Sequence, residues 1–163
     1  MTALKTLLFL ILVPGTAAGW VPFWLGRWRG GLPEPELGIW HHVGWLLLVP
    51  GIAVLLWTAF EFVAKGQGTP APIDPPKRLV STGMYRFVRN PMYVGVLSAT
   101  IGQFFLYESW NVLAYAAVLW AAFQIFVVAY EEPTLHRLFG DEFTSYCREV
   151  PRWIPRFRPA KLL

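Results

Sequence analysis

Four long apolar stretches constrain the fold of this chain more than any other feature of its sequence. They cover residues 6–25, 43–60, 92–107 and 110–130, and none of them contains Asp, Glu, Lys or Arg. A helix needs roughly 20 mostly apolar residues to cross a bilayer, and all four stretches meet or approach that length. A hydrophobic content of 55% with nine Trp residues also exceeds what a soluble domain of this size carries. The sequence therefore predicts an all-α polytopic membrane protein with four transmembrane helices.

The positive charges indicate how these helices are oriented. Of fourteen Lys and Arg residues, only Arg27 and Arg29 fall between the first and second stretches, and the other twelve flank the opposite helix ends. Because positively charged segments stay in the cytoplasm, both termini and the linker after the second stretch are expected on the cytoplasmic side of the cell (inner) membrane. The net charge of +4 favours anionic lipid head groups. Aromatic and basic residues do not alternate on any polar segment, so nucleic acid is not an expected partner.

Glycine and proline predict where the helices bend and how closely they pack. Pro14-Gly15 should kink the first helix, and the carbonyl that the kink frees needs a partner on a neighbouring helix. Pro91 suits the first turn of the third helix, where its missing N–H does no harm. A face of small residues on that helix should let another helix approach closely; it consists of Gly95, Ser98, Ala99 and Gly102. Residues 107–109 leave room only for a tight hairpin, so the third and fourth helices should be antiparallel neighbours.

Outside these stretches, proline and glycine predict an irregular linker and two short helices. Four prolines between residues 70 and 76 favour an extended strap along the membrane face. Pro133 should end the fourth helix at Glu132, because a residue before proline disfavours helical dihedral angles. Two interfacial amphipathic helices are expected to follow, with the tail over the linker. Gly140 should close the first of them, and the second should place Phe143, Tyr146 and Val150 on one face.

The hairpin should bring residues 90–93 alongside the consecutive acids Glu131 and Glu132. Two carboxylates at the end of an otherwise uncharged helix are costly near lipid and need a partner. From residue chemistry alone, a structural ion pair with Arg86 or Arg89 is favoured over a ligand site.

Several familiar catalytic sites are excluded. Neither a G-x-G-x-x-G, a G-x-x-x-x-G-K nor an H-E-x-x-H motif occurs. Cys147 is the single cysteine and offers neither an internal disulfide nor a metal site. His41 and His42 are adjacent, so they cannot hold a metal from one helix face. His136 has no convincing serine partner, so hydrolysis by a Ser-His-Asp triad is not expected.

Two motifs together resemble a known family. The segment G-x-Y-R-x-V-R-N-P-x-Y at residues 83–93 is followed, after a helix hairpin, by E-E-P-x-L-x-x-x-F-G-x-x-F-x-x-Y-x-x-x-V-P-R-W-I-P at residues 131–155. In this order and spacing they resemble the isoprenylcysteine carboxyl methyltransferase and phospholipid methyltransferase family of integral membrane enzymes. The resemblance covers about residues 77–156, roughly half of the chain, and implies a cytoplasmic binding site for S-adenosylmethionine.

The resemblance also implies which residues contact the cofactor. They are Lys77, Arg78, Leu79, Val80, Tyr85, Arg89, Asn90, Pro91, Met92, Tyr93, Glu131 and Glu132. Tyrosine faces and a carboxylate can hold the sulfonium cation, and Arg89 or Arg152 would pair with the methionyl carboxylate. Members that act on prenylated cysteine carry a substrate-holding arginine about one turn before the acidic pair, where this chain has Val127 and Val128. Arg148 or Arg152 would therefore have to hold an anionic substrate.

The implied function is methyl transfer from S-adenosylmethionine to a lipophilic acceptor (a lipid amine, a thiol or a carboxylate) at the cytoplasmic membrane face, without a metal. Residues 1–163 are expected to form one domain with its cofactor-binding core at about 77–156. Two alternatives stay open at this point: a membrane reductase that uses NADPH, and a non-enzymatic membrane assembly factor that keeps the motif for packing alone.

Overall fold

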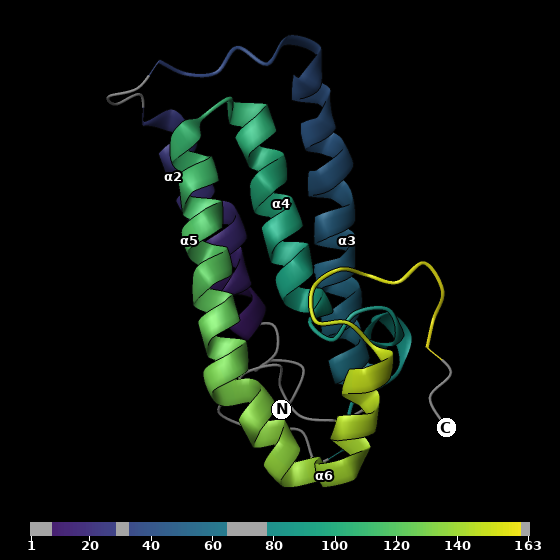
Figure 1. Cartoon of the computed structure of the whole chain (residues 1–163). Coiled ribbons are helices and arrows are strands. Elements are labelled where there is room, and N and C mark those ends of the chain that lie inside the picture. The colour runs from purple at the N-terminus through teal and green to yellow at the C-terminus, as the bar shows by residue number, and fades with distance from the viewer. Residues whose placement is uncertain (1–7, 29–32, 65–77, 161–163) are drawn as a thin grey trace.

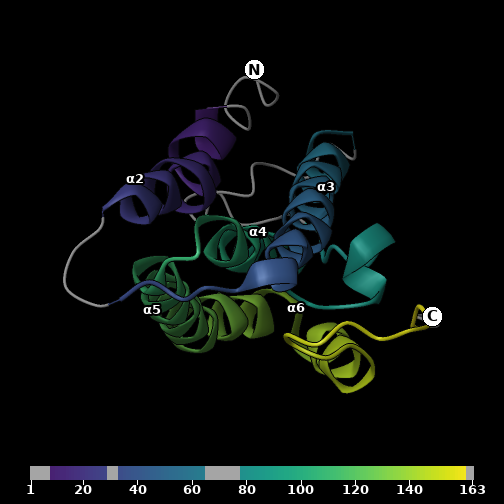
Figure 2. The ribbon, with the colours of Figure 1, turned by 90° about the horizontal axis from the view of Figure 1, so that it is seen from above.

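The computed structural model describes residues 8–28, 33–64 and 78–160, which fold into helices joined by turns and short irregular segments. No β-strand occurs in this described part of the chain, and the all-α prediction is confirmed. The long helices stand side by side, with α4 between α3 on one side and α2 and α5 on the other (Figure 1, Figure 2). The C-terminal segment folds back near the lower ends of α3 and α4 (Figure 1).

The elements follow the apolar stretches of the sequence. In chain order they are η1 (Thr16–Trp20), α2 (Val21–Arg27), η2 (Gly38–His42), α3 (Val43–Ala64), η3 (Gly83–Arg86), α4 (Pro91–Tyr107), α5 (Trp110–Phe126), η4 (Val127–Glu131) and α6 (Glu132–Glu149). η1 and η4 are π-helical turns, whereas η2 and η3 are 3₁₀ turns. Pro91 occupies the first turn of α4, as predicted. α5 then runs antiparallel to α4, which confirms the predicted hairpin, and the turn between them contains Glu108 with φ of 51°.

Three of the described helices are long and apolar enough to cross a membrane. They are Leu8–Arg27, Gly38–Glu61 and Trp110–Glu149. α4 has 17 residues, about 26 Å at 1.5 Å per residue, whereas a hydrocarbon core is about 30 Å thick. Much of α4 is enclosed by other helices, including Val96 and Thr100 at 2% and 0% exposure. The protein is thus a membrane protein with a short helix at its centre.

α3 and α4 pack through glycines that face each other. A Cβ atom on Gly95 would lie 2.7 Å from the carbonyl oxygen of Gly51, and one on Gly102 would lie 2.7 Å from that of Gly44. Real Cβ atoms do not approach a carbonyl this closely, so only glycine permits the contact. Ser98 adds a 2.8 Å hydrogen bond to a backbone carbonyl of α3. The predicted small-residue face is confirmed, and its partner is α3.

The first helix is irregular at the predicted place, directly after Pro14-Gly15, where η1 forms a π-turn. A π-turn replaces the usual i→i−4 hydrogen bonds, which leaves carbonyls available to other donors. Gln103 of α4 donates to the Ala18 carbonyl at 2.5 Å, and Tyr115 of α5 donates to the Ala17 carbonyl at 3.0 Å. Side chains of neighbouring helices therefore bind carbonyls of the turn that follows Pro14. The carbonyl that Pro14 itself frees is that of Leu10, four residues earlier, and its expected partner stays a prediction.

The predicted end of the fourth helix at Glu132 is wrong. α5 continues through η4 and Pro133 into α6, so that the helix runs from Trp110 to the kink at Gly140. The π-turn η4 explains why Pro133 is tolerated: the Glu132 N–H bonds to the carbonyl of Val127, and the wider turn relieves the clash between a proline ring and the carbonyl four residues earlier. Gly140 has non-helical dihedral angles (φ 51°, ψ −121°) and divides α6 where the sequence predicted a break.

Beyond Gly140, α6 buries its apolar face against the end of the chain. Phe143, Tyr146 and Val150 are 4%, 4% and 1% exposed and form a cluster with Ala160. The predicted common face of these side chains is confirmed. The cluster holds the tail against α6.

We expect Gly95→Leu to destabilise the protein, because the new side chain would overlap the Gly51 carbonyl and push α3 and α4 apart. Overpacked contacts of this kind cost about 1–3 kcal/mol. Thermal unfolding in detergent measures the loss, with Ala117→Leu on the exposed side of α5 as the control. Equal midpoints for the two variants would contradict the close packing of α3 on α4.

Candidate functional site

The tail of the chain is tied to the linker by hydrogen bonds to the backbone. The Arg89 N–H donates to the Pro151 carbonyl at 2.9 Å, and the Ala160 N–H donates to the Arg86 carbonyl at 2.9 Å. The Arg86 guanidinium donates two hydrogen bonds, of 2.9 and 2.7 Å, to the Ala160 carbonyl. These contacts fix residues 86–90 against residues 150–160 and so position the arginines of both segments.

Glu132 joins these two segments to the long helix. Its Oε1 accepts hydrogen bonds from Arg89 at 2.9 Å and from Arg152 at 2.8 Å, and its Oε2 accepts a second one from Arg152 at 2.7 Å. Hydrogen bonding to Glu132 raises the pKa of Arg152. Asn90 donates to the Arg152 carbonyl at 3.1 Å, which fixes the backbone that carries this arginine. The ion pair with Arg89 was one of the two predicted pairs, and Arg152 is an additional partner.

Glu131 faces Tyr93 instead of the arginines, because consecutive helical residues point about 100° apart. Its Oε2 accepts a 3.0 Å hydrogen bond from the Tyr93 hydroxyl. The Tyr93 ring stacks on Phe123 at 4.6 Å between centroids, and the Trp153 ring lies 6.4 Å away. The Trp153 indole is itself fixed by a 2.7 Å hydrogen bond to Gln124. The result is a carboxylate beside a group of aromatic rings.

A third acid, Glu61, lies at the end of α3 beside η3. Its side chain is 7% exposed, and a Cβ atom on Gly83 would overlap its carboxylate. Gly83 also has φ of +57°, so glycine is required both for the backbone and for the space. Two residues later, the Tyr85 carbonyl accepts a 2.8 Å hydrogen bond from Tyr146. Burial, then the charge of Glu131 and more weakly that of Glu61, raise the pKa of the Tyr85 hydroxyl well above its usual value.

Residues 39–142 match the model of a family described as phospholipid methyltransferase, a range that includes α3, α4, α5 and both acids. The chain belongs to the phospholipid methyltransferase family. The predicted resemblance is thereby confirmed.

The chain is also similar to several named proteins, among them protein-S-isoprenylcysteine O-methyltransferases. Protein-S-isoprenylcysteine O-methyltransferase B of Arabidopsis thaliana is 34% identical over 79 residues, which cover 48% of this chain and 40% of the relative. A probable protein-S-isoprenylcysteine O-methyltransferase of Oryza sativa subsp. indica is 34% identical over 126 residues, 74% of this chain and 65% of the relative. The cobalt-zinc-cadmium resistance protein CzcN of Cupriavidus metallidurans is 30% identical over 130 residues, 80% of this chain and 54% of the relative. The chain thus spans between about two fifths and two thirds of the length of these relatives.

Several of the predicted residues lie at the N-terminal end of α4, where the motif of residues 83–93 ends. Asn90, Pro91 and Met92 are buried in and before the first turn of α4, and Val80 is buried in the linker. Leu79 is partly buried against the cluster formed by α6 and the tail. The exposed residues of the predicted set are Arg78 and Arg148. Lys77 lies outside the described residues.

Sequence reasoning missed four residues of this region, and different signals could have found them. Trp153 lies within the second motif, in the segment V-P-R-W-I-P. Phe123 and Gln124 lie about two helical turns before Glu131, which places them near its face of the helix. Glu61 follows the second apolar stretch directly, and the structure buries its carboxylate against Gly83.

We expect Glu132→Gln to destabilise the protein, because it removes the charge that binds Arg89 and Arg152. Hydrogen bonds to charged groups contribute about 1.5–3 kcal/mol, and the two arginines keep 14% and 32% exposure, which moderates the loss. Denaturant titration in detergent measures the change. The control is Glu149→Gln, since the Glu149–Arg156 pair is 3.7 Å long and exposed. Equal stability of both variants would show that Glu132 does not hold the linker and the tail together.

Proposed function

We propose that this protein is an integral membrane methyltransferase that uses S-adenosylmethionine and acts on a lipophilic acceptor at the cytoplasmic membrane face. Family membership supports the reaction class. The single observation that carries the proposal is the 3.0 Å contact between Tyr93 and Glu131, because it joins the two family motifs. It also places a carboxylate and an aromatic face next to each other.

The residues around Glu131 fit the cofactor by their chemistry. When bound, S-adenosylmethionine supplies an electrophilic methyl group on a positively charged sulfur. Glu131 offers a carboxylate, and Tyr85, Tyr93 and Trp153 offer ring faces, each worth roughly 0.5–2 kcal/mol toward a cation. A carboxylate can also accept hydrogen bonds from ribose hydroxyls. The linker residues Arg78, Leu79 and Val80, with residues 89–92, would form the wall of the site.

Glu131 and Glu132 have different roles in this proposal. Glu132 accepts three hydrogen bonds from two arginines and thereby positions the linker and the tail. Glu131 is bound by a neutral phenol, so its charge is available to a cationic ligand. Arg152 keeps more exposure than Arg89, 32% against 14%, and is the better candidate for the methionyl carboxylate.

The acceptor would enter from the bilayer. Val127 is 1% exposed and Val128 is 44% exposed, so the helix turn before Glu131 presents an apolar side chain to lipid. Although several relatives are named for isoprenylcysteine O-methylation, valine at this turn favours a lipid amine, a thiol or another small apolar acceptor over a prenylcysteine carboxylate. In-line methyl transfer needs alignment and the exclusion of water rather than an ion pair at this point.

The proposal includes the orientation in the membrane. α4, with its cytoplasmic end sunk below the interface, would be the fourth span, beside the three longer helices. The charge distribution supports cytoplasmic termini and linker. α6 and the tail would then lie at the interface and cover the cofactor site from the cytoplasm, which leaves Arg148 as the arginine on the substrate side.

We expect Glu131→Ala to weaken the binding of S-adenosylhomocysteine and of S-adenosylmethionine roughly tenfold or more, because a charge-assisted contact is lost. Tyr93→Phe should have a smaller effect of the same sign. Titration calorimetry in detergent measures both, and Glu142→Ala, an exposed acid on α6, is the control. Unchanged binding in Glu131→Ala, with an intact melting profile, would overturn the assignment of this carboxylate.

A second experiment separates the reaction classes. Purified protein is melted with S-adenosylhomocysteine and with NADPH, and stabilisation by the first alone supports the methyltransferase. Stabilisation by NADPH would support a reductase, and stabilisation by neither would support an assembly factor. Incubation with methyl-labelled S-adenosylmethionine and a total membrane lipid extract then identifies the acceptor as the species that gains the label.

A further inference from the structure

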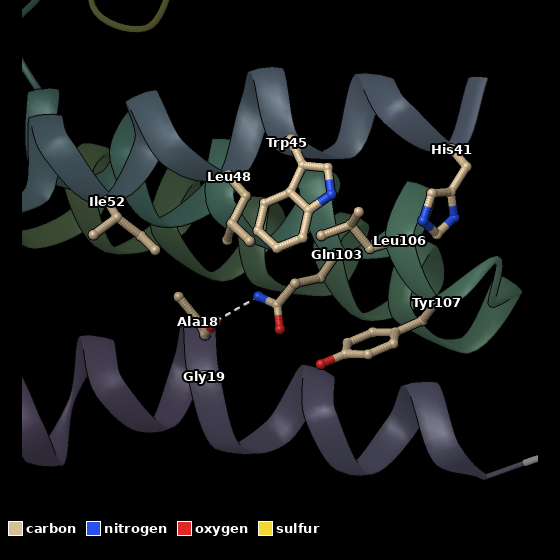
Figure 3. Close-up of a pocket in the computed structure, with 9 residues that line it drawn as sticks. All are labelled: Ala18, Gly19, His41, Trp45, Leu48, Ile52, Gln103, Leu106 and Tyr107. Atoms are coloured by element: carbon tan, nitrogen blue, oxygen red, sulfur yellow. Dashed lines mark hydrogen bonds between the residues drawn. The ribbon is translucent and has the colours of Figure 1, made fainter. Parts of the chain in front are cut away.

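A pocket lies at the other end of the bundle, between the first helix, α3 and α4 (Figure 3). Its volume is about 440 Å³, which lies within the range of about 300–1,000 Å³ typical of small-molecule sites. From the transfer site at Tyr93 to Gln103 in the pocket wall, α4 rises about 15 Å at 1.5 Å per residue. Buried side chains of α4, among them Val96 and Thr100, lie between the two. The pocket is therefore separate from the proposed methyl-transfer site.

The lining of the pocket changes from polar to apolar along α3. His41 lies in η2, just before α3 begins, and Tyr107 is the last residue of α4. Leu48 and Ile52 line the opposite end, about 10 Å and about 16 Å from His41 at 1.5 Å per residue. Figure 3 shows the Gln103 side-chain oxygen and the Tyr107 hydroxyl directed into the space between the first helix and α3. A lipid in a bilayer leaflet has the same order, with its polar end at the surface and its chain toward the midplane.

The chemistry of the lining selects an uncharged polar end. None of the nine described residues that line the pocket is Asp, Glu, Lys or Arg. The amide of Gln103 gives its N–H to the Ala18 carbonyl, so its oxygen is the group left to accept a hydrogen bond from a ligand. An amide oxygen and a phenol suit a hydroxyl group, whereas a phosphate or a carboxylate would have no cation to pair with.

The pocket opens sideways to the region of lipid. Trp45 and Ile52 line it and are still 55% and 42% exposed. A Cβ atom on Gly19 would meet no atom within 4 Å, so the wall formed by the first helix leaves open space here. An occupant can thus enter from the bilayer without unfolding any part of the protein.

We propose that this pocket binds a neutral bilayer lipid, with its hydroxyl-bearing end at Gln103 and Tyr107 and its hydrocarbon chain along Leu48 and Ile52. The lipid fills the space between the first helix and α3, and it is bound rather than methylated. In the orientation proposed above it comes from the outer leaflet. Its binding depends on none of the residues assigned to S-adenosylmethionine.

A photoreactive long-chain alcohol with a diazirine on its chain tests this site in the detergent-purified full-length protein, without any cofactor. We expect labelling of peptides from α3 and α4 that contain residues 45–52 and 103–107, and competition by unlabelled monoacylglycerol. Gly19→Leu should reduce this labelling roughly tenfold or more, since its side chain would occupy the pocket. Tyr107→Phe should reduce the affinity about fivefold, the effect of one neutral hydrogen bond.

Thr16→Leu, an exposed position on the same helix outside the pocket lining, is the matched control and should label like the original protein. The corresponding photoreactive fatty acid should label less than the alcohol, because its carboxylate lacks a cation. Labelling spread evenly over the lipid-facing helices, or equal labelling of Gly19→Leu and Thr16→Leu, would overturn the proposal. Binding of S-adenosylhomocysteine, measured separately, should be the same in Gly19→Leu and Tyr107→Phe as in the unaltered protein, so that failure of one site is distinguishable from failure of the other.

Discussion

The hydrogen bonds between Glu132 and the two arginines hold together three parts of the chain that are far apart in sequence. Arg89 belongs to the linker before α4, Glu132 to the long helix that follows α5, and Arg152 to the tail. Near a membrane an unpaired charge is costly, so displacing the linker or the tail would leave its own arginine without a counter-charge, and displacing the helix would leave both arginines without one. One arrangement of linker, helix and tail is therefore favoured. In that arrangement Glu131 meets Tyr93.

Two π-turns shape the long helices, and each lies next to a proline. η1 follows Pro14 in the first helix, and η4 precedes Pro133 between α5 and α6. A π-turn inserts one residue into a turn, so it changes the direction of the side chains that follow and exposes carbonyls. In the first helix, side chains of α4 and α5 bind these carbonyls and so tie the helix to the bundle. Between α5 and α6, η4 lets the helix continue past Pro133, so both acids lie on a helix and face different partners.

The two ends of the bundle differ in the chemistry they present. At one end, Glu132 is hydrogen-bonded to two arginines, and Glu131 is hydrogen-bonded to Tyr93, whose ring stacks on Phe123. Charged and aromatic groups of this kind suit a charged cofactor. At the other end the pocket is lined by an imidazole, an amide and a phenol among apolar groups, which suits a neutral amphiphile. α4 connects the two ends, and its glycine contacts with α3 keep it close to that helix along much of its length. The proposed lipid and the proposed cofactor would therefore contact different side chains.

The sequence by itself determined the helical class, the apolar segments, the small-residue face of α4, the break at Gly140 and the family motifs. These properties depend on local composition and on spacing along the chain. It also predicted that Asn90, Tyr93 and the two acids would meet, because a three-residue hairpin leaves no other geometry. Only the tertiary structure decided that Glu132 binds two arginines while Glu131 binds Tyr93, since the π-turn η4 changes the direction in which both acids point relative to α5. The same turn explains why the helix does not stop at Pro133. The expectation that it would stop considered only Pro133 and the residue before it, whereas the π-turn involves five residues, Val127–Glu131. Phe123, Trp153 and the buried Glu61 likewise depend on packing between distant segments, which spacing along the chain does not encode.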